Sequence, residues 1–281
     1  MDKLKLTPVS ALMIQWAKET GKNQLLNRFM EHLDFSAGDE LIDEARNICD
    51  WYDEVILNKK YFIYNYINEE LQKSDKEFLL IFPAAGSYPH ALELIDTHCH
   101  KINRIIEIDK TGMEEKQELY DRFFPHCSEK IKCISADISS KIILDVISNL
   151  IEEYYSDIPS IIVLDNVSYF MQISDIKNII NSFKSSGKKN TLILDSLRPF
   201  EKVNVEKRNI PKHIFEKLQK FSGVEKITSL DSHTLETLFK KIGGELKKSG
   251  NLVSMEKQRT GNNYCFKDTN DSWLDCSVWK I

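Results

Sequence analysis

Two patterns of apolar residues divide the chain near residue 75. Before it, apolar residues recur every three or four positions, as in Leu25, Leu26, Phe29, Met30 and Leu33, which is the spacing of an amphipathic helix. After it, short runs rich in Ile, Leu and Val alternate with helix-like stretches. The pattern predicts a helical N-terminal part over residues 1–75 and an α/β core over residues 76–281.

The short apolar runs of the core indicate five strands. Their residues are apolar on both faces, which is typical of parallel strands covered by helices on both sides. Helix-like stretches separate the runs, so the pattern predicts an open, doubly wound sheet with right-handed crossovers. The predicted strands cover residues 78–84, 102–109, 130–137, 160–165 and 190–196, and helices are expected from residue 87 and over 112–123, 140–154 and 174–185.

The C-terminal part departs from this alternation. A helix is predicted over residues 231–242, and two strand-like runs follow around 245–256 and 273–280, joined through the segment RTGNN. Strands so close in sequence favour an antiparallel hairpin. We therefore expect a seven-stranded Rossmann-like sheet of five parallel strands with an antiparallel hairpin at its edge.

Candidate ligand-binding residues follow the predicted strands. In open α/β sheets, ligands bind at the carboxyl ends of the strands. The first strand leads into a turn with a single glycine, and the next three strands end in acids. The candidate residues are Ala84, Ala85, Gly86, Ser87 and Tyr88 in the turn, then Glu107 and Asp109, Asp137 and Ile138, and Asp165 and Asn166.

Spacing suggests a role for two of these acids. Asp109 follows Gly86 by 23 residues, close to the offset of about 20 residues at which an acid binds ribose hydroxyls. Glu107 lies on the same side of the strand by alternation and is a second candidate. Asp137 could accept from an adenine amino group while the backbone N–H of Ile138 donates to the ring. Asp109 and Asp137 could instead cap the helices that follow them.

The turn itself discriminates between cofactors. A pyrophosphate needs several close backbone N–H groups and therefore several glycines, whereas Ala84, Gly86 and Tyr88 occupy the three glycine positions here. S-adenosyl-L-methionine (SAM) has no phosphate, so the turn favours SAM over NAD. The P-loop pattern GxxxxGK[ST] does not occur.

Four segments together resemble a known family. PAAGSYPHALEL, IEID, ADIS and LDNVSYFM resemble, in order and spacing, motifs of the leucine carboxyl methyltransferase-like branch of class I SAM-dependent methyltransferases. The resemblance implies that Gly86, Asp109, Asp137, Ile138 and Asp165 contact SAM.

The same resemblance extends to neighbouring positions. Asn166 stands at a family glycine, and Tyr169 or Phe170 stands at a family aromatic residue. Tyr64 stands where a basic residue usually holds the SAM carboxylate, with Lys59 and Lys60 nearby.

This family implies methyl transfer, with residues 1–75 as a cap over cofactor and substrate. We expect O-methylation of a small molecule or a carboxylate, with His90 as the candidate base and Tyr169 and Arg198 as candidate substrate-binding residues. Arg198 could equally be a surface residue. Two alternatives remain open: aminocarboxypropyl transfer from SAM, as in nicotianamine-like synthesis, and a non-catalytic binding subunit.

Composition narrows the class of protein further. The net charge of −5 gives no support for nucleic-acid binding. The six cysteines form no CxxC pair, which favours reduced thiols in a cytoplasmic protein. We expect no membrane span, since no apolar run reaches about 20 residues, and no signal peptide. We also expect no metal, because His98 and His100 cannot share a helix face and no ligand set completes a zinc site with His90.

Overall fold

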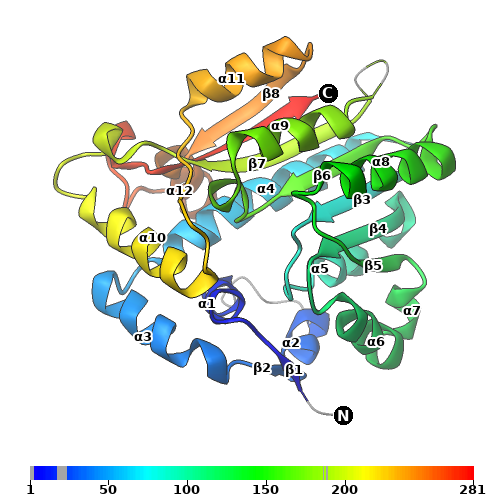
Figure 1. Ribbon diagram of the computed structural model, residues 1–281, viewed down its shortest axis with the longest axis horizontal. Helices are drawn as coiled ribbons and strands as arrows, with labels where there is room; N and C mark the ends of the chain where they lie inside the picture. Colours follow the sequence, from blue (N-terminus) through cyan, green and yellow to red (C-terminus); the bar gives the residue numbers. More distant parts are fainter. Residues whose placement is uncertain (1–2, 18–23, 186, 188) are drawn as a thin grey trace.

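One mixed sheet organises the protein. In the computed structural model, residues 3–17, 24–185, 187 and 189–281 are described (Figure 1), and within them seven strands pair in the order β5-β4-β3-β6-β7-β9-β8. β3 to β7 are parallel, and β9 runs antiparallel to both β7 and β8. The strands are β3 (Phe78–Pro83), β4 (Ile102–Asp109), β5 (Ile131–Ser135), β6 (Ser160–Leu164), β7 (Thr191–Leu197), β8 (Glu245–Asn251) and β9 (Leu274–Lys280).

Alternate residues of each central strand enter different hydrophobic clusters. In β3, Leu80 and Phe82 pack into one cluster, whereas Leu79 and Ile81 pack into the other, because successive side chains of a strand point to opposite faces. The first cluster includes α4 (Asp53–Lys73), α5 (His90–His98), α6 (Met113–Phe123) and α12 (Leu252–Thr260). The second includes α8 (Lys141–Tyr155), α9 (Ile173–Ser182) and α11 (Ser232–Lys241). The doubly wound sheet is therefore confirmed.

The N-terminal part is helical, as predicted, apart from two short strands that pair in parallel, β1 (Leu4–Lys5) and β2 (Leu33–Asp34). Its helices α1 (Pro8–Ala17), α2 (Gln24–Met30), α3 (Asp39–Ile48) and α4 contribute to the same hydrophobic cluster as one face of the sheet. Figure 1 shows α1, α2 and α3 gathered beside the sheet together with α10 (Asn209–Ser222). The division into two domains at residue 75 stays a prediction.

The C-terminal connection differs from the predicted turn. β8 and β9 pair as expected, but β8 ends at Asn251, and residues 252–256 begin α12 instead of extending the strand. Asn251 and Ser254 form a reciprocal capping box, with Ser254 N donating to Asn251 Oδ1 at 2.9 Å. Such a box satisfies free N–H groups at a helix start. The hairpin strands are therefore joined by a helix and a loop, and α10 also had no sequence prediction.

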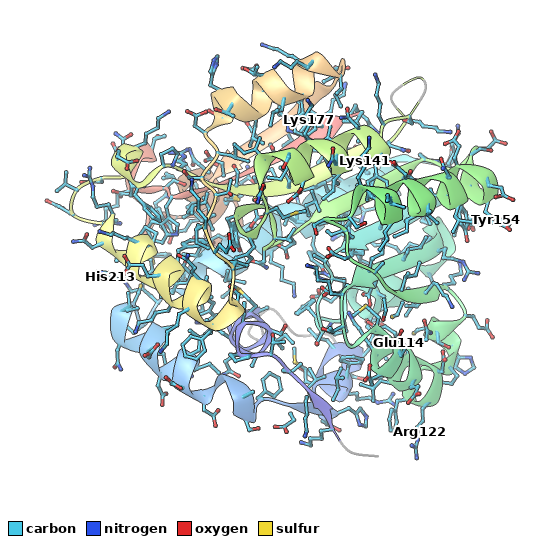
Figure 2. All side chains as sticks on the ribbon, viewed as in Figure 1. Glu114, Arg122, Lys141, Tyr154, Lys177 and His213 are labelled. Carbon is cyan, nitrogen blue, oxygen red and sulfur yellow. The ribbon has the colours of Figure 1, made fainter. Side chains whose placement is uncertain are left out.

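Charged and apolar residues both reach the outside of the molecule. Arg122, Tyr154 and His213 lie at its rim (Figure 2) and are exposed. Among the described residues, no helix is both long enough and apolar enough to cross a bilayer.

Candidate functional site

Two cavities meet at the carboxyl ends of β3, β4 and β6. The inner cavity, of about 230 Å³, lies between α1, the turn after β3 and the end of β6. The outer cavity, of about 910 Å³, lies between the ends of β4 and β5 and residues 171–175 and 224–229. Both are lined by Ala84, Asp109, Val167 and Phe170. Together they form one elongated site at the position expected for a ligand of this sheet.

The turn after β3 keeps a left-handed backbone without its first glycine. Ala84 has φ 58° and Gly86 has φ 55°, and both line the inner cavity with Ala85, Ser87 and Tyr88. A residue with a Cβ in this region costs about 1–2 kcal/mol. The protein thus retains the backbone path of a glycine-rich turn at Ala84, with local strain.

Replacing Ala84 by glycine is expected to raise the free energy of unfolding by up to about 1 kcal/mol, since relief of strain exceeds the added unfolded-state entropy. Urea denaturation measures the change. Ala85, outside the left-handed region, is the matched control: Ala85→Gly is expected to destabilise. Equal destabilisation by both substitutions would contradict the strain at Ala84.

Asp109 lies where the two cavities join. Its Oδ2 accepts from Gly86 N at 2.8 Å and its Oδ1 accepts from Lys110 N at 2.7 Å. The helix after it is capped by Gly112, so the alternative of Asp109 as an N-cap is wrong. Its carboxylate is fixed to the turn and faces both cavities.

Asp137 and Ile138 line the outer cavity. Asp137 accepts from Ser139 N at 2.9 Å and Ser139 Oγ at 2.6 Å, and it pairs with Lys110 at 3.0 Å. The N-cap of α8 is Ser140, so Asp137 does not cap that helix either.

Glu107 is not a cavity residue, which corrects its prediction as a second ribose ligand. It is fully buried and pairs with Lys116 Nζ at 2.9 Å, while accepting from Ala91 N at 3.0 Å and Tyr120 Oη at 3.0 Å. Lys116 in turn donates to the carbonyls of Gly86 at 2.9 Å and Tyr88. The pair therefore supports the turn from beneath.

The basic residue of the inner cavity is Lys60, not Tyr64. Lys60 lines the cavity, pairs with Glu93 at 2.9 Å and lies 4.1 Å from the ring centroid of Tyr88. Tyr64 lies one helical turn further along α4, lines neither cavity and contacts His90 Nδ1 at 2.9 Å. This corrects the predicted position of Tyr64 as a cofactor contact.

His90 faces the inner cavity from the first turn of α5. Its ring stacks on Phe82 with centroids 4.6 Å apart. Burial lowers the pKa of His90 to about 3, so the imidazole is neutral at neutral pH. Since Nδ1 contacts Tyr64 Oη, the neutral imidazole can accept a hydrogen bond from a ligand at Nε2 when Nδ1 carries the proton.

The end of β6 is held by a lysine that the sequence analysis did not assign. Lys59 Nζ contacts Asp165 Oδ1 at 2.9 Å, Asp195 Oδ2 at 2.7 Å and Asn166 Oδ1. Asp165 and Asn166 line the inner cavity, and Asn166 has φ 59°, so it adopts the backbone expected of the glycine it replaces. The resemblance placed Lys59 only near the position expected to hold a carboxylate; its pairing with Asp165 and Asp195 was not predicted, because these partners lie more than 100 residues away.

Two predicted substrate-binding residues lie outside the site. Tyr169 is buried and donates to Asn166 Oδ1 at 2.9 Å. Arg198 holds Asp275 through Nε and Nη2 at 2.7 and 2.6 Å. Neither lines the two cavities, so both predictions are corrected. Phe170, the alternative to Tyr169 at the family aromatic position, lines both cavities, as does Val167 of the same motif. The other apolar lining residues of the inner cavity lie outside the motifs: Val9, Met13, Ile14, Ala17 and Ile56.

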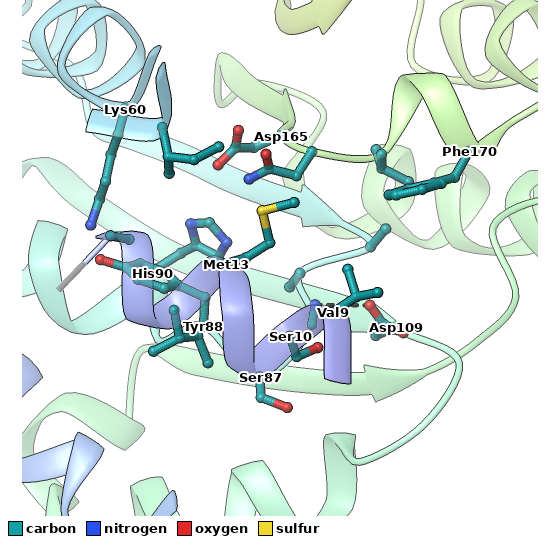
Figure 3. Close-up of a pocket in the computed structure, with 18 residues that line it drawn as sticks. Val9, Ser10, Met13, Lys60, Ser87, Tyr88, His90, Asp109, Asp165 and Phe170 are labelled. Atoms are coloured by element: carbon teal, nitrogen blue, oxygen red, sulfur yellow. Dashed lines mark hydrogen bonds between the residues drawn. The ribbon is translucent and has the colours of Figure 1, made fainter. Parts of the chain in front are cut away.

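Figure 3 shows how the labelled residues of the inner cavity are arranged. Lys60, Tyr88 and His90 lie toward one end and Asp109 and Phe170 toward the other, while α1 lies across the cavity with Val9, Ser10 and Met13. Among the described residues, no group of three or more His, Cys, Asp and Glu is arranged to hold a metal ion.

The strand order and the antiparallel β9 define the fold as that of class I SAM-dependent methyltransferases. Among solved structures, a Thermobifida fusca protein described as a candidate methyltransferase matches with a TM-score of 0.64 at 10% identity, over 98% of this chain and 95% of that chain. A DUF574 family protein from Streptomyces avermitilis matches with a TM-score of 0.56 at 12% identity, over 96% of each chain. No family model and no curated protein matches the sequence.

Proposed function

We propose that the protein binds SAM and transfers its methyl group to an oxygen of a small molecule or a carboxylate. The observation that carries the proposal is the elongated site itself, with Asp109 at the junction of two cavities at the switch point of the sheet. The fold of the sheet and the polar residues that line this site also support SAM binding.

The lining residues match the parts of SAM in order. Asp137 and Ile138 would hold the adenine in the outer cavity, and Asp109 would accept from the ribose hydroxyls. The methionine part would lie along the turn at Gly86, with Lys60 toward its carboxylate and Asp165 toward its amino group. SAM, when bound, supplies an electrophilic methyl group on a sulfonium.

The protein's contribution is positioning and exclusion of water. Val9, Met13 and Ile14 of α1 and Phe170 form apolar walls around the inner cavity, which favours an in-line approach of acceptor and methyl group. A carboxylate acceptor needs no strong base. For a hydroxyl acceptor, the neutral imidazole of His90 is the candidate to receive the hydrogen bond of the acceptor O–H.

Removing the carboxylate of Asp109 is expected to weaken SAM binding roughly 10- to 100-fold, because a hydrogen bond to a charged group contributes about 1.5–3 kcal/mol. Titration calorimetry of Asp109→Ala and of the isosteric Asp109→Asn measures the loss. Asp157→Ala, an exposed acid in the loop before β6, removes the same charge away from the site and should bind as the parent does.

Three outcomes separate the proposed function from its alternatives. No SAM binding by the unmodified protein would favour the non-catalytic subunit. Binding with equal affinity in the parent and Asp109→Ala would overturn the assignment of Asp109. Turnover that leaves methylthioadenosine in place of S-adenosylhomocysteine would identify aminocarboxypropyl transfer.

A further inference from the structure

A buried lysine joins the N-terminal helices to the ends of β6 and β7. The side chain of Lys59, from α4, is 1% exposed, and its ammonium group lies between Asp165 and Asp195. Burying a lysine requires partners that compensate for lost solvation. Here one positive charge meets two carboxylates, so the cluster keeps a net charge of −1 beside the inner cavity.

The two carboxylates that pair with Lys59 differ in how exposed they are. Lys59 donates hydrogen bonds to Asp195 Oδ2 and to Asn166 Oδ1. Asp165 Oδ1 is buried and pairs with Lys59 Nζ at 2.9 Å, but the Asp165 side chain as a whole is 12% exposed, whereas that of Asp195 is 0% exposed. Lys59 thus compensates the charge of both carboxylates, and only Asp165 keeps part of its side chain exposed.

Asp165, unlike Asp195, lines the inner cavity. Burial raises the pKa of Asp165, but the charge of Lys59 and its neighbours holds the pKa below its ordinary value. The cavity therefore presents an ionised, partly exposed carboxylate on the same side as the basic residue Lys60 (Figure 3). A carboxylate of this kind binds an ammonium group.

We propose that Lys59 is a positioning residue: it keeps Asp165 ionised and open to accept hydrogen bonds, so that this subsite binds the ammonium group of an α-amino acid moiety. The inference rests on the proposed function, where that moiety is the methionine part of SAM. It assigns a role in ligand recognition to the helical N-terminal part, through α4.

The test compares two ligands and two variants by titration calorimetry. The ligands are S-adenosylhomocysteine and its analogue with hydrogen in place of the α-amino group. The background variant is Asp195→Asn, which removes a carboxylate that does not line the cavity. Adding Lys59→Met to this background also removes the cation and leaves Asp165 as the single charge, so the net charge of the cluster changes from 0 in the background to −1, the value in the parent. Because Asp165 is partly exposed, the variant is expected to fold.

In the parent protein and in Asp195→Asn, we expect S-adenosylhomocysteine to bind at least about 10-fold more tightly than the deaminated analogue, because only S-adenosylhomocysteine can form a charge-assisted hydrogen bond with Asp165. In the double variant, this preference is expected to fall to about 1, while the analogue binds as in the background. A merely structural role of Lys59 would weaken both ligands equally and preserve the preference.

Two other results would contradict the proposal. An unchanged preference in the double variant shows that Asp165 binds the ammonium group without Lys59, and no preference in the parent shows that Asp165 does not bind it. If the parent binds neither S-adenosylhomocysteine nor SAM, the proposed function fails together with this inference; if it binds both, only the role of Lys59 is at stake.

Discussion

Replacing Lys116 by methionine is expected to lower the free energy of unfolding by about 3–5 kcal/mol, because it leaves the carboxylate of Glu107 buried without its countercharge. Both side chains are 0% exposed. Lys116 also holds two carbonyls of the turn after β3. Since a domain is stable by only about 5–15 kcal/mol, urea denaturation should show a much lower midpoint.

Two controls separate this effect from the loss of any lysine. Lys73→Met removes an exposed lysine that pairs with Glu69 and is expected to cost less than about 1 kcal/mol. Adding Glu107→Gln to Lys116→Met removes the unpaired charge and is expected to restore about 1–3 kcal/mol. A loss below about 1 kcal/mol for Lys116→Met would show that the buried pair does not hold the turn.

Glu107 and Asp109 show which feature of the site could not be predicted from the sequence, namely which of two similar acids lines the cavities. They stand two residues apart near the end of β4, and both are acids on the same side of the strand. Asp109 lines both cavities, whereas Glu107 is enclosed by α6 through Lys116 and Tyr120. The packing of α5 and α6 around Glu107 distinguishes the two acids, and no local pattern encodes it.

The fold was easier to predict because its signal is local. Each parallel strand is a short run of apolar residues that is visible from neighbouring residues alone, and β4 has the predicted bounds, Ile102–Asp109. α12 was missed because the side-chain capping by Asn251 and Ser254 outweighs a strand-like apolar pattern. The individual lining residues of α1 were not predicted, because their place in the site depends on contacts between residues far apart in sequence.

Acidification from pH 6.5 to pH 5 is expected to destabilise the parent protein by about 2 kcal/mol more than the variant His90→Gln. Burial lowers the pKa of His90 from 6.5 to about 3. Below pH 6.5 the unfolded chain takes up a proton at this position and the folded chain does not, so stability present above pH 6.5 is lost as the pH falls. Urea denaturation at pH 7, 6 and 5 measures the loss.

The difference between parent and variant isolates His90 from other groups that titrate in this range. Burial raises the pKa of Asp195 to about 6, which opposes the effect of His90, but this contribution is common to both proteins. His213→Gln, a change at an exposed histidine on α10, should follow the parent at every pH. If His90→Gln also follows the parent, His90 takes up a proton in the folded protein as readily as in the unfolded chain, which would contradict its proposed role as a neutral hydrogen-bond acceptor for a hydroxyl substrate.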